Sequence, residues 1–115
     1  MRVIVAGGRD FSDYAKLSGS LDMLLSGVEV SCIVSGCARG ADLLGERYAE
    51  ERGYAVVRYP ADWGLYGRSA GPVRNRVMAA NADALVAFWD GESRGTADMI
   101  SVARAGGLGV RVVRY

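Results

Sequence analysis

The sequence predicts an α/β fold, a Rossmann-like three-layer α/β/α arrangement in which helices cover both faces of a five-stranded, mostly parallel sheet. Short and uniformly apolar runs, which are typical of strands buried on both faces, alternate with longer mixed segments. Half of the 115 residues are apolar, so a real core can form. Right-handed crossovers between successive parallel strands then place helices on both sides of the sheet.

The first half of the chain predicts three strands and two helices. The run Val3-Ile4-Val5 opens the first strand, and leucines at 17, 21, 24 and 25 recur at helical spacing. Gly53 is expected to cap the second helix in the left-handed conformation. The expected elements are a strand at 3–6, a helix at 14–26, a strand at 31–35, a helix at 41–52 and a strand at 55–58.

The second half begins with an expected long loop, because glycines interrupt residues 59–71. Pro72 suits the first turn of a helix, and Gly106-Gly107 ends the last one. The expected elements are a loop at 59–71, a helix at 72–81, a strand at 84–88, a helix at 96–105 and a strand at 110–113. We expect the strand order 3-2-1-4-5, with a ligand crevice between strands one and four.

The length of the chain limits the number of domains, and its net charge limits the classes of partner. We expect one domain over residues 1–115, and because so small a domain has a thin stability margin we expect a homodimer or higher homo-oligomer. The apolar run at 3–6 is too short for a signal peptide, and no stretch approaches the ~20 apolar residues of a membrane span, so we expect a cytoplasmic protein without membrane contact. A net charge of +1 disfavours nucleic acid as a partner.

The absence of histidine excludes Ser-His-Asp and Cys-His catalysis and most metal sites. Cys32 lies in an apolar run and is expected in the core, whereas Cys37 lies in a loop. The spacing of these two cysteines fits no zinc pattern. We therefore expect no metal and no bound cofactor.

Unusual residues gather after the expected strands, where ligands bind in an open parallel sheet. The four segments that follow the first four strands are rich in Gly, Arg and Asp, and they hold both tryptophans. Arg supplies thirteen of the fourteen cationic residues, and a GC-rich genome is an alternative explanation of that bias. Five arginines fall on this one rim, which favours phosphate or carboxylate recognition by guanidinium. They are Arg9, Arg39, Arg68, Arg74 and Arg94.

Each rim segment has a functional and a structural interpretation. The run from Ser93 to Thr96 begins a helix, so it is either a phosphate site beside Arg94 or an ordinary helix cap. Asp42 either satisfies a helix dipole or binds ribose hydroxyls. Trp63 and Trp89 either stack on a base or belong to the core. These alternatives stay open at the level of sequence.

Two sets of candidate residues follow. The expected ligand-binding residues are Gly7, Gly8, Arg9, Asp10, Ser35, Gly36, Arg39, Gly40, Asp42, Asp62, Trp63, Arg68, Arg74, Asn75, Trp89, Arg94, Gly95 and Thr96. Catalytic residues are unknown, and the candidates are Arg74, Asp10, Asp62 and Asp90.

Taken together, these motifs resemble the SLOG superfamily, which joins the DprA/SMF proteins and the Lonely-guy phosphoribohydrolases. The likeness is greatest to its small YspA-like (YAcAr) branch, common in bacteria and phages, and it covers nearly the whole chain. The residues that carry it are 3–11, Ser35-Gly36, 39–42, 59–63, 70–72, Arg74-Asn75 with Met78, and Gly95-Thr96. The resemblance implies a Rossmann-like sheet that binds nucleotides or their derivatives.

The resemblance also implies a test of catalysis. In Lonely-guy enzymes an Arg and a Glu act in cleaving the N-glycosidic bond of a nucleoside monophosphate. The Arg motif is similar to the segment from Arg74 to Met78, but Met99 stands where the Glu is expected, and Ser93 replaces a loop glycine. Asp98 is adjacent, but the helical period turns it about 100° away from Met99.

Three functions are compatible with these residues. The leading one is binding or sensing of a nucleotide or an NAD- or ADP-ribose-like derivative, with phosphate at Gly95-Thr96 and Gly7-Gly8. The alternative is a phosphoribohydrolase-type N-glycosidase, or a deoxyribosyltransferase-like enzyme, in which an Asp replaces the missing Glu. A single-stranded DNA binder is the third, and the near-neutral charge disfavours it.

Overall fold

The computed structural model describes all residues 1–115, and its five strands form one sheet with every neighbouring pair parallel. The order is β3-β2-β1-β4-β5, as the sequence predicts. Arg2 and Val3 of β1 lie in register with Cys32 and Ile33 of β2. The strands are β1 (Arg2–Gly7), β2 (Cys32–Ser35), β3 (Ala55–Arg58), β4 (Ala84–Trp89) and β5 (Gly109–Arg114).

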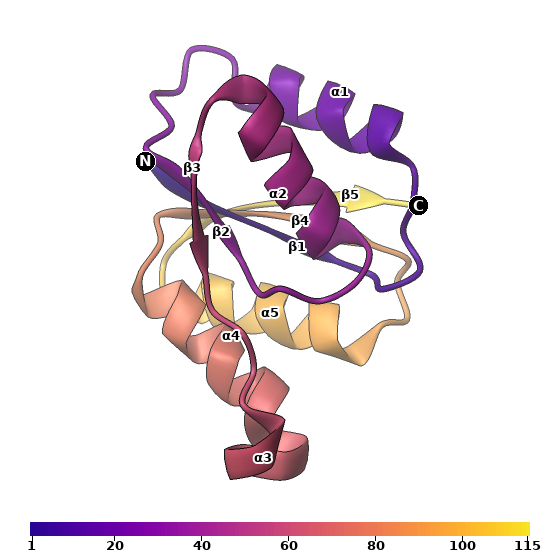
Figure 1. Cartoon of the computed structure of the whole chain (residues 1–115), viewed down its shortest axis with the longest axis vertical. Coiled ribbons are helices and arrows are strands. Elements are labelled where there is room, and N and C mark those ends of the chain that lie inside the picture. The colour runs from indigo at the N-terminus through magenta and orange to yellow at the C-terminus, as the bar shows by residue number, and fades with distance from the viewer.

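Two helices cover each face of the sheet, which confirms the three-layer prediction (Figure 1). The helices are α1 (Tyr14–Leu24), α2 (Ala41–Arg52), α4 (Ala70–Ala80) and α5 (Arg94–Ala105). Alternation along β1 sends Val3 and Val5 into the core beneath α1 and α2, and Ile4 and Ala6 into the core above α4 and α5. No helix is long and apolar enough to cross a bilayer.

The segment 59–71 is not the loop that its glycines predict. It contains a short helix, α3 (Trp63–Tyr66), then a 3-10 turn (Gly67–Ser69), and α4 already begins at Ala70. The Asp62 carboxylate starts α3 by accepting the Leu65 N–H at 3.0 Å. The side chain of Ala70 is buried and anchors the start of α4. As a result α3 projects from one end of the molecule, beyond α4 (Figure 1).

The other boundaries differ from the expected ones by a few residues at most. The helix 41–52 and the strand 55–58 are confirmed, and Gly53 adopts the expected left-handed conformation with φ of 76°. Helix α1 stops at Leu24 rather than at residue 26, and α5 begins two residues early at Arg94. The earlier start of α5 matters because it places Arg94 and Gly95 in the first helical turn.

Candidate functional site

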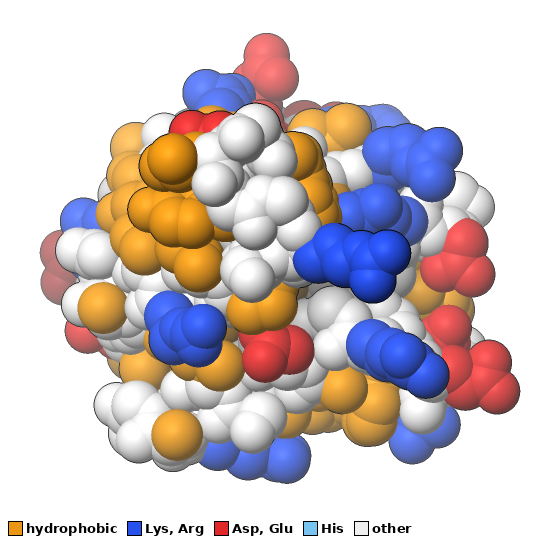
Figure 2. Space-filling view, turned by 90° about the horizontal axis from the view of Figure 1, so that it is seen from below, with side chains coloured by type: hydrophobic (Ala, Val, Ile, Leu, Met, Phe, Trp, Pro, Cys, Tyr) orange, Lys and Arg blue, Asp and Glu red, His pale blue; other side chains and the backbone are white.

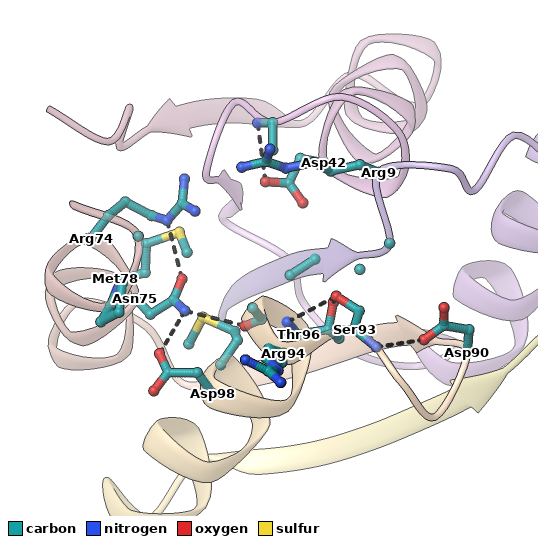
Figure 3. Close-up of a pocket in the computed structure, with 18 of the residues that line it drawn as sticks. Arg9, Asp42, Arg74, Asn75, Met78, Asp90, Ser93, Arg94, Thr96 and Asp98 are labelled. Carbon is teal, nitrogen blue, oxygen red and sulfur yellow. Dashed lines mark hydrogen bonds between the residues drawn. The ribbon is translucent and has the colours of Figure 1, made fainter. Parts of the chain in front are cut away.

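A cavity of about 550 Å³ lies beyond the C-terminal ends of β1 and β4, at the predicted crevice. It is lined by the turns after these two strands and by the starts of α2, α4 and α5. Figure 3 shows Arg74 and Asn75 on α4 facing this space, with Arg9 and Asp42 across it. The predicted residues that it brings together are Gly7, Gly8, Arg9, Asp10, Asp42, Trp63, Arg74, Asn75, Asp90, Arg94, Gly95 and Thr96.

Two more predicted residues, Gly36 and Arg39, line a smaller adjoining cavity, and five lie outside both. Among these five, Asp62 caps α3, and Arg68 is exposed on the 3-10 turn. The remaining three are Ser35, Gly40 and Trp89.

These three residues support the loops rather than line the cavity. The Ser35 hydroxyl donates to Glu46 Oε2 at 2.6 Å and is fully buried. Gly40 begins α2 with φ of 79°, and a Cβ there would lie 2.2 Å from the Gly8 oxygen. Trp89 Nε1 donates to the Ser93 oxygen at 3.0 Å, so its polar edge is already satisfied.

The first turn of α5 forms part of the cavity wall. Ser93 Oγ accepts the Thr96 N–H at 3.4 Å and lies 3.1 Å from Thr96 Oγ1, which fixes the helix start. A Cβ built on Gly95 would meet no atom within 4 Å, so its backbone is open to a ligand. An open helix N-terminus with a guanidinium beside it, here that of Arg94, favours an anion.

Asp90 shapes the loop that leads into this turn. Its Oδ1 accepts the N–H groups of Glu92 and Ser93, each at 2.8 Å, and Figure 3 shows the bond from Ser93. These two bonds, the Ser93 bond first, hold the pKa of Asp90 below its ordinary value. Asp90 is therefore an ionised loop anchor, which makes it a poor general acid.

A polar network joins α4 to α5 and orients Arg74. Asn75 is almost fully buried; its Oδ1 accepts from Arg74 Nε at 3.1 Å and its Nδ2 donates to Asp98 Oδ2 at 2.8 Å. The Arg74 guanidinium also donates to the Gly36 oxygen at the end of β2. Arg74 is thereby held between the two cavities, both of which it lines.

Asp98, which the helical period set aside at the level of sequence, lines the cavity and is a functional candidate. The helical period turns the side chains of Asp98 and Met99 about 100° apart around α5. Both residues nevertheless line the cavity. The bond between Asp98 and Asn75 crosses between two helices. Such a contact depends on helix packing, so no local pattern predicts it.

Asp42 is a buried carboxyl at the first turn of α2. It is only 5% exposed, and its Oδ2 accepts the Ala38 N–H at 3.2 Å. Burial raises its pKa to about 6, although the Ala38 bond and the charge of Arg74 act in the opposite direction. The cavity thus contains a carboxyl that changes charge near neutral pH.

Replacing Asp42 with asparagine is expected to change how stability depends on pH. Between about pH 4 and pH 6 the folded wild type binds more protons than the unfolded chain, so its free energy of unfolding falls as pH rises. Asp42→Asn removes this loss, and the free energy of unfolding of the variant relative to wild type should rise by roughly 2 kcal/mol from pH 4 to pH 7. Urea unfolding of both proteins at the two pH values measures the difference, and an unchanged difference would contradict the assignment.

Comparison with solved structures finds the same fold in DNA processing protein A from Helicobacter pylori, described for its single-stranded DNA binding mode. The TM-score is 0.71 at 19% sequence identity, and the match covers 100% of this chain but only 66% of that one. No curated protein matches the sequence.

This likeness corrects the expectation that nucleic acid is disfavoured as a partner. A protein that shares the fold over the whole length of this chain binds single-stranded DNA. The expectation rested on a net charge of +1, but net charge averages over the surface, whereas a ligand meets the local charge of one rim. A near-neutral net charge is therefore no ground for excluding a nucleic-acid strand as a partner.

Residues 1–66 match the family described as the YspA, cpYpsA-related SLOG family (YAcAr). The matched part contains β1, β2, β3 and the glycine and arginine turns that follow them. This extent is more than half of the sequence, and the matched family is the one that the motifs resemble, although the motifs at 70–96 lie beyond the matched residues. The chain belongs to the YspA-related SLOG family.

Proposed function

We propose that the larger cavity binds a phosphate-bearing nucleotide, either free or at the end of a nucleic-acid strand. The observation that carries this is the convergence of three guanidinium groups on one concave site, those of Arg9, Arg74 and Arg94. None of the three forms a salt bridge within the protein, whereas the ion-paired arginines lie away from the cavity; these are Arg47, Arg52 and Arg58. Unpaired guanidinium groups are suited to phosphate.

The cavity has the size and lining that a nucleotide needs. Its volume of about 550 Å³ lies within the range of small-molecule sites. In this proposal the phosphate lies at the first turn of α5, beside Arg94. Asp42 is in a position to accept from ribose hydroxyls, and Trp63, which is 52% exposed, offers a face to the base. Asp62 and Trp89, which the sequence also placed among the ligand-binding candidates, lie outside the cavity.

Comparing adenosine with AMP by isothermal titration calorimetry tests this proposal. AMP should bind at least tenfold more tightly, because charge-assisted hydrogen bonds to phosphate contribute about 1.5–3 kcal/mol each. Arg94→Ala should remove most of that advantage. Arg104→Ala is the matched control, since Arg104 is on the same helix but outside the cavity. Equal affinity for the two ligands, or equal effects of the two variants, would refute the proposal.

Cleavage of an N-glycosidic bond is a second candidate, and Asp98 is the observation that favours it. The family glutamate is absent at Met99, but the Asp98 carboxylate lines the same wall and is oriented by Asn75. A carboxylate in that place could stabilise an oxocarbenium-like transition state or activate water. Release of free base from nucleoside monophosphates, lost in Asp98→Asn, would establish it; no release by the wild type would dismiss it.

A further inference from the structure

A second cavity, of about 280 Å³, adjoins the first. It is formed by the turn after β2 and by the segment between β3 and α3. The two cavities share four lining residues, which are Arg9, Ala38, Trp63 and Arg74. A ligand that fills the larger cavity can therefore continue into the smaller one past Arg74 without crossing the body of the protein.

The two cavities differ in charge. Arg9, Arg39 and Arg74 line the smaller cavity, and no Asp or Glu does. Four aspartates accompany the arginines of the larger cavity. None of the three arginines of the smaller cavity forms a salt bridge. The smaller cavity is thus electropositive and suits a bare anion, whereas the larger suits a mixture of phosphate and hydroxyl groups.

Trp63 lies at the junction of the two cavities. The residue is 52% exposed and begins α3 beside the start of α4, where a Cβ on Gly71 would lie 3.8 Å from the edge of the indole ring. The face of the molecule at this end shows hydrophobic side chains next to several Lys or Arg side chains (Figure 2). An exposed aromatic ring among guanidinium groups is a stacking platform for a base.

We propose that the smaller cavity is a second phosphate subsite, so that the ligand is a dinucleotide-sized molecule with two phosphates rather than a mononucleotide. This inference rests on the proposed function, because the first nucleotide unit occupies the larger cavity. Arg39 lines only the smaller cavity and Arg94 only the larger, so each arginine reports on one of the two phosphates. Pyrophosphate-linked and phosphodiester-linked ligands share this chemistry.

Arg39→Ala and Arg94→Ala separate the two subsites by calorimetry. The probes are AMP, with one phosphate, and two ligands with two phosphates: ADP-ribose and the 5′-phosphorylated deoxyadenosine dinucleotide. Arg39→Ala should lower the affinity for the tighter-binding two-phosphate ligand at least tenfold, and it should change the affinity for AMP less than twofold. Arg94→Ala should lower the affinity for every ligand that the wild type binds. Arg68→Ala is the control, because Arg68 lines neither cavity.

The outcomes are distinct from those that test the proposed function. Tighter binding than AMP by ADP-ribose alone identifies a pyrophosphate-linked ligand. Tighter binding than AMP by the dinucleotide alone identifies a nucleic-acid strand. Both results support the second subsite. If the wild type binds AMP as tightly as both two-phosphate ligands, or if Arg39→Ala affects AMP equally, the second subsite is refuted while the mononucleotide site stands. Insensitivity of AMP binding to Arg94→Ala refutes the proposed function itself.

Discussion

Arg74→Met is expected to weaken AMP binding by at least thirtyfold. Arg74 lines both cavities, and the Asn75 amide and the Gly36 oxygen already hold its guanidinium in place. A phosphate therefore meets a donor that loses little further freedom on binding, and loss of a charged hydrogen bond of roughly 2–3 kcal/mol corresponds to about 30–150-fold in affinity. Calorimetry with the purified variant measures the change.

Two controls separate this effect from misfolding. Arg68→Met removes an exposed arginine outside both cavities and should leave AMP affinity within twofold. Arg74→Lys keeps the charge but loses the planar fork, so it should recover only part of the affinity. If Arg74→Met melts within a few degrees of wild type and still binds AMP normally, Arg74 is not a ligand contact.

Gly7→Ala is expected to destabilise the fold by about 3 kcal/mol, the upper end of overpacking effects. Gly7 ends β1 next to β4, and a Cβ there would lie 2.3 Å from the Phe88 oxygen and 2.8 Å from Ala41 Cβ. Both neighbours belong to the packed centre, so the strands or α2 must move apart. The melting temperature should fall by about 10 °C or more.

Gly19→Ala is the matched control for that variant. Gly19 lies within α1, is exposed, and would place its Cβ in open space. Alanine there should raise stability by up to about 1 kcal/mol through helix propensity alone. Thermal unfolding by circular dichroism compares the two variants, and a Gly7→Ala protein that melts with the wild type would show that β1 and β4 are not packed as described.

The strands and the site edge were predictable because each depends on local composition, whereas the strand order followed from the fold class. Apolar runs such as the one at 84–88 are too short and too uniform for surface helices, and parallel strands bring their carboxyl ends to one edge. Glycine and arginine turns after those runs, such as the one containing Arg9, then had to meet at that edge. The cavity gathers residues from both ends of the chain in this way.

The parts that sequence did not predict depend on contacts between distant residues. Helix α3 forms because Asp62 caps it, although glycines at 64, 67 and 71 favour a loop by propensity. Trp89 follows a buried run, and only the fold shows that its Nε1 is bonded to Ser93. The orientation of Asp98 likewise depends on how α4 packs against α5.

Chemical-shift mapping with AMP tests whether one rim of the sheet binds the phosphate of a nucleotide. Backbone amide resonances of the ¹⁵N-labelled protein should shift most at Gly8, Arg94, Gly95 and Thr96, with the Arg74 Nε signal. The loops at the opposite ends of the strands, 26–30, 53–54 and 81–83, should not shift. Shifts concentrated in those opposite loops, or none at millimolar AMP, would show that this rim does not bind the phosphate.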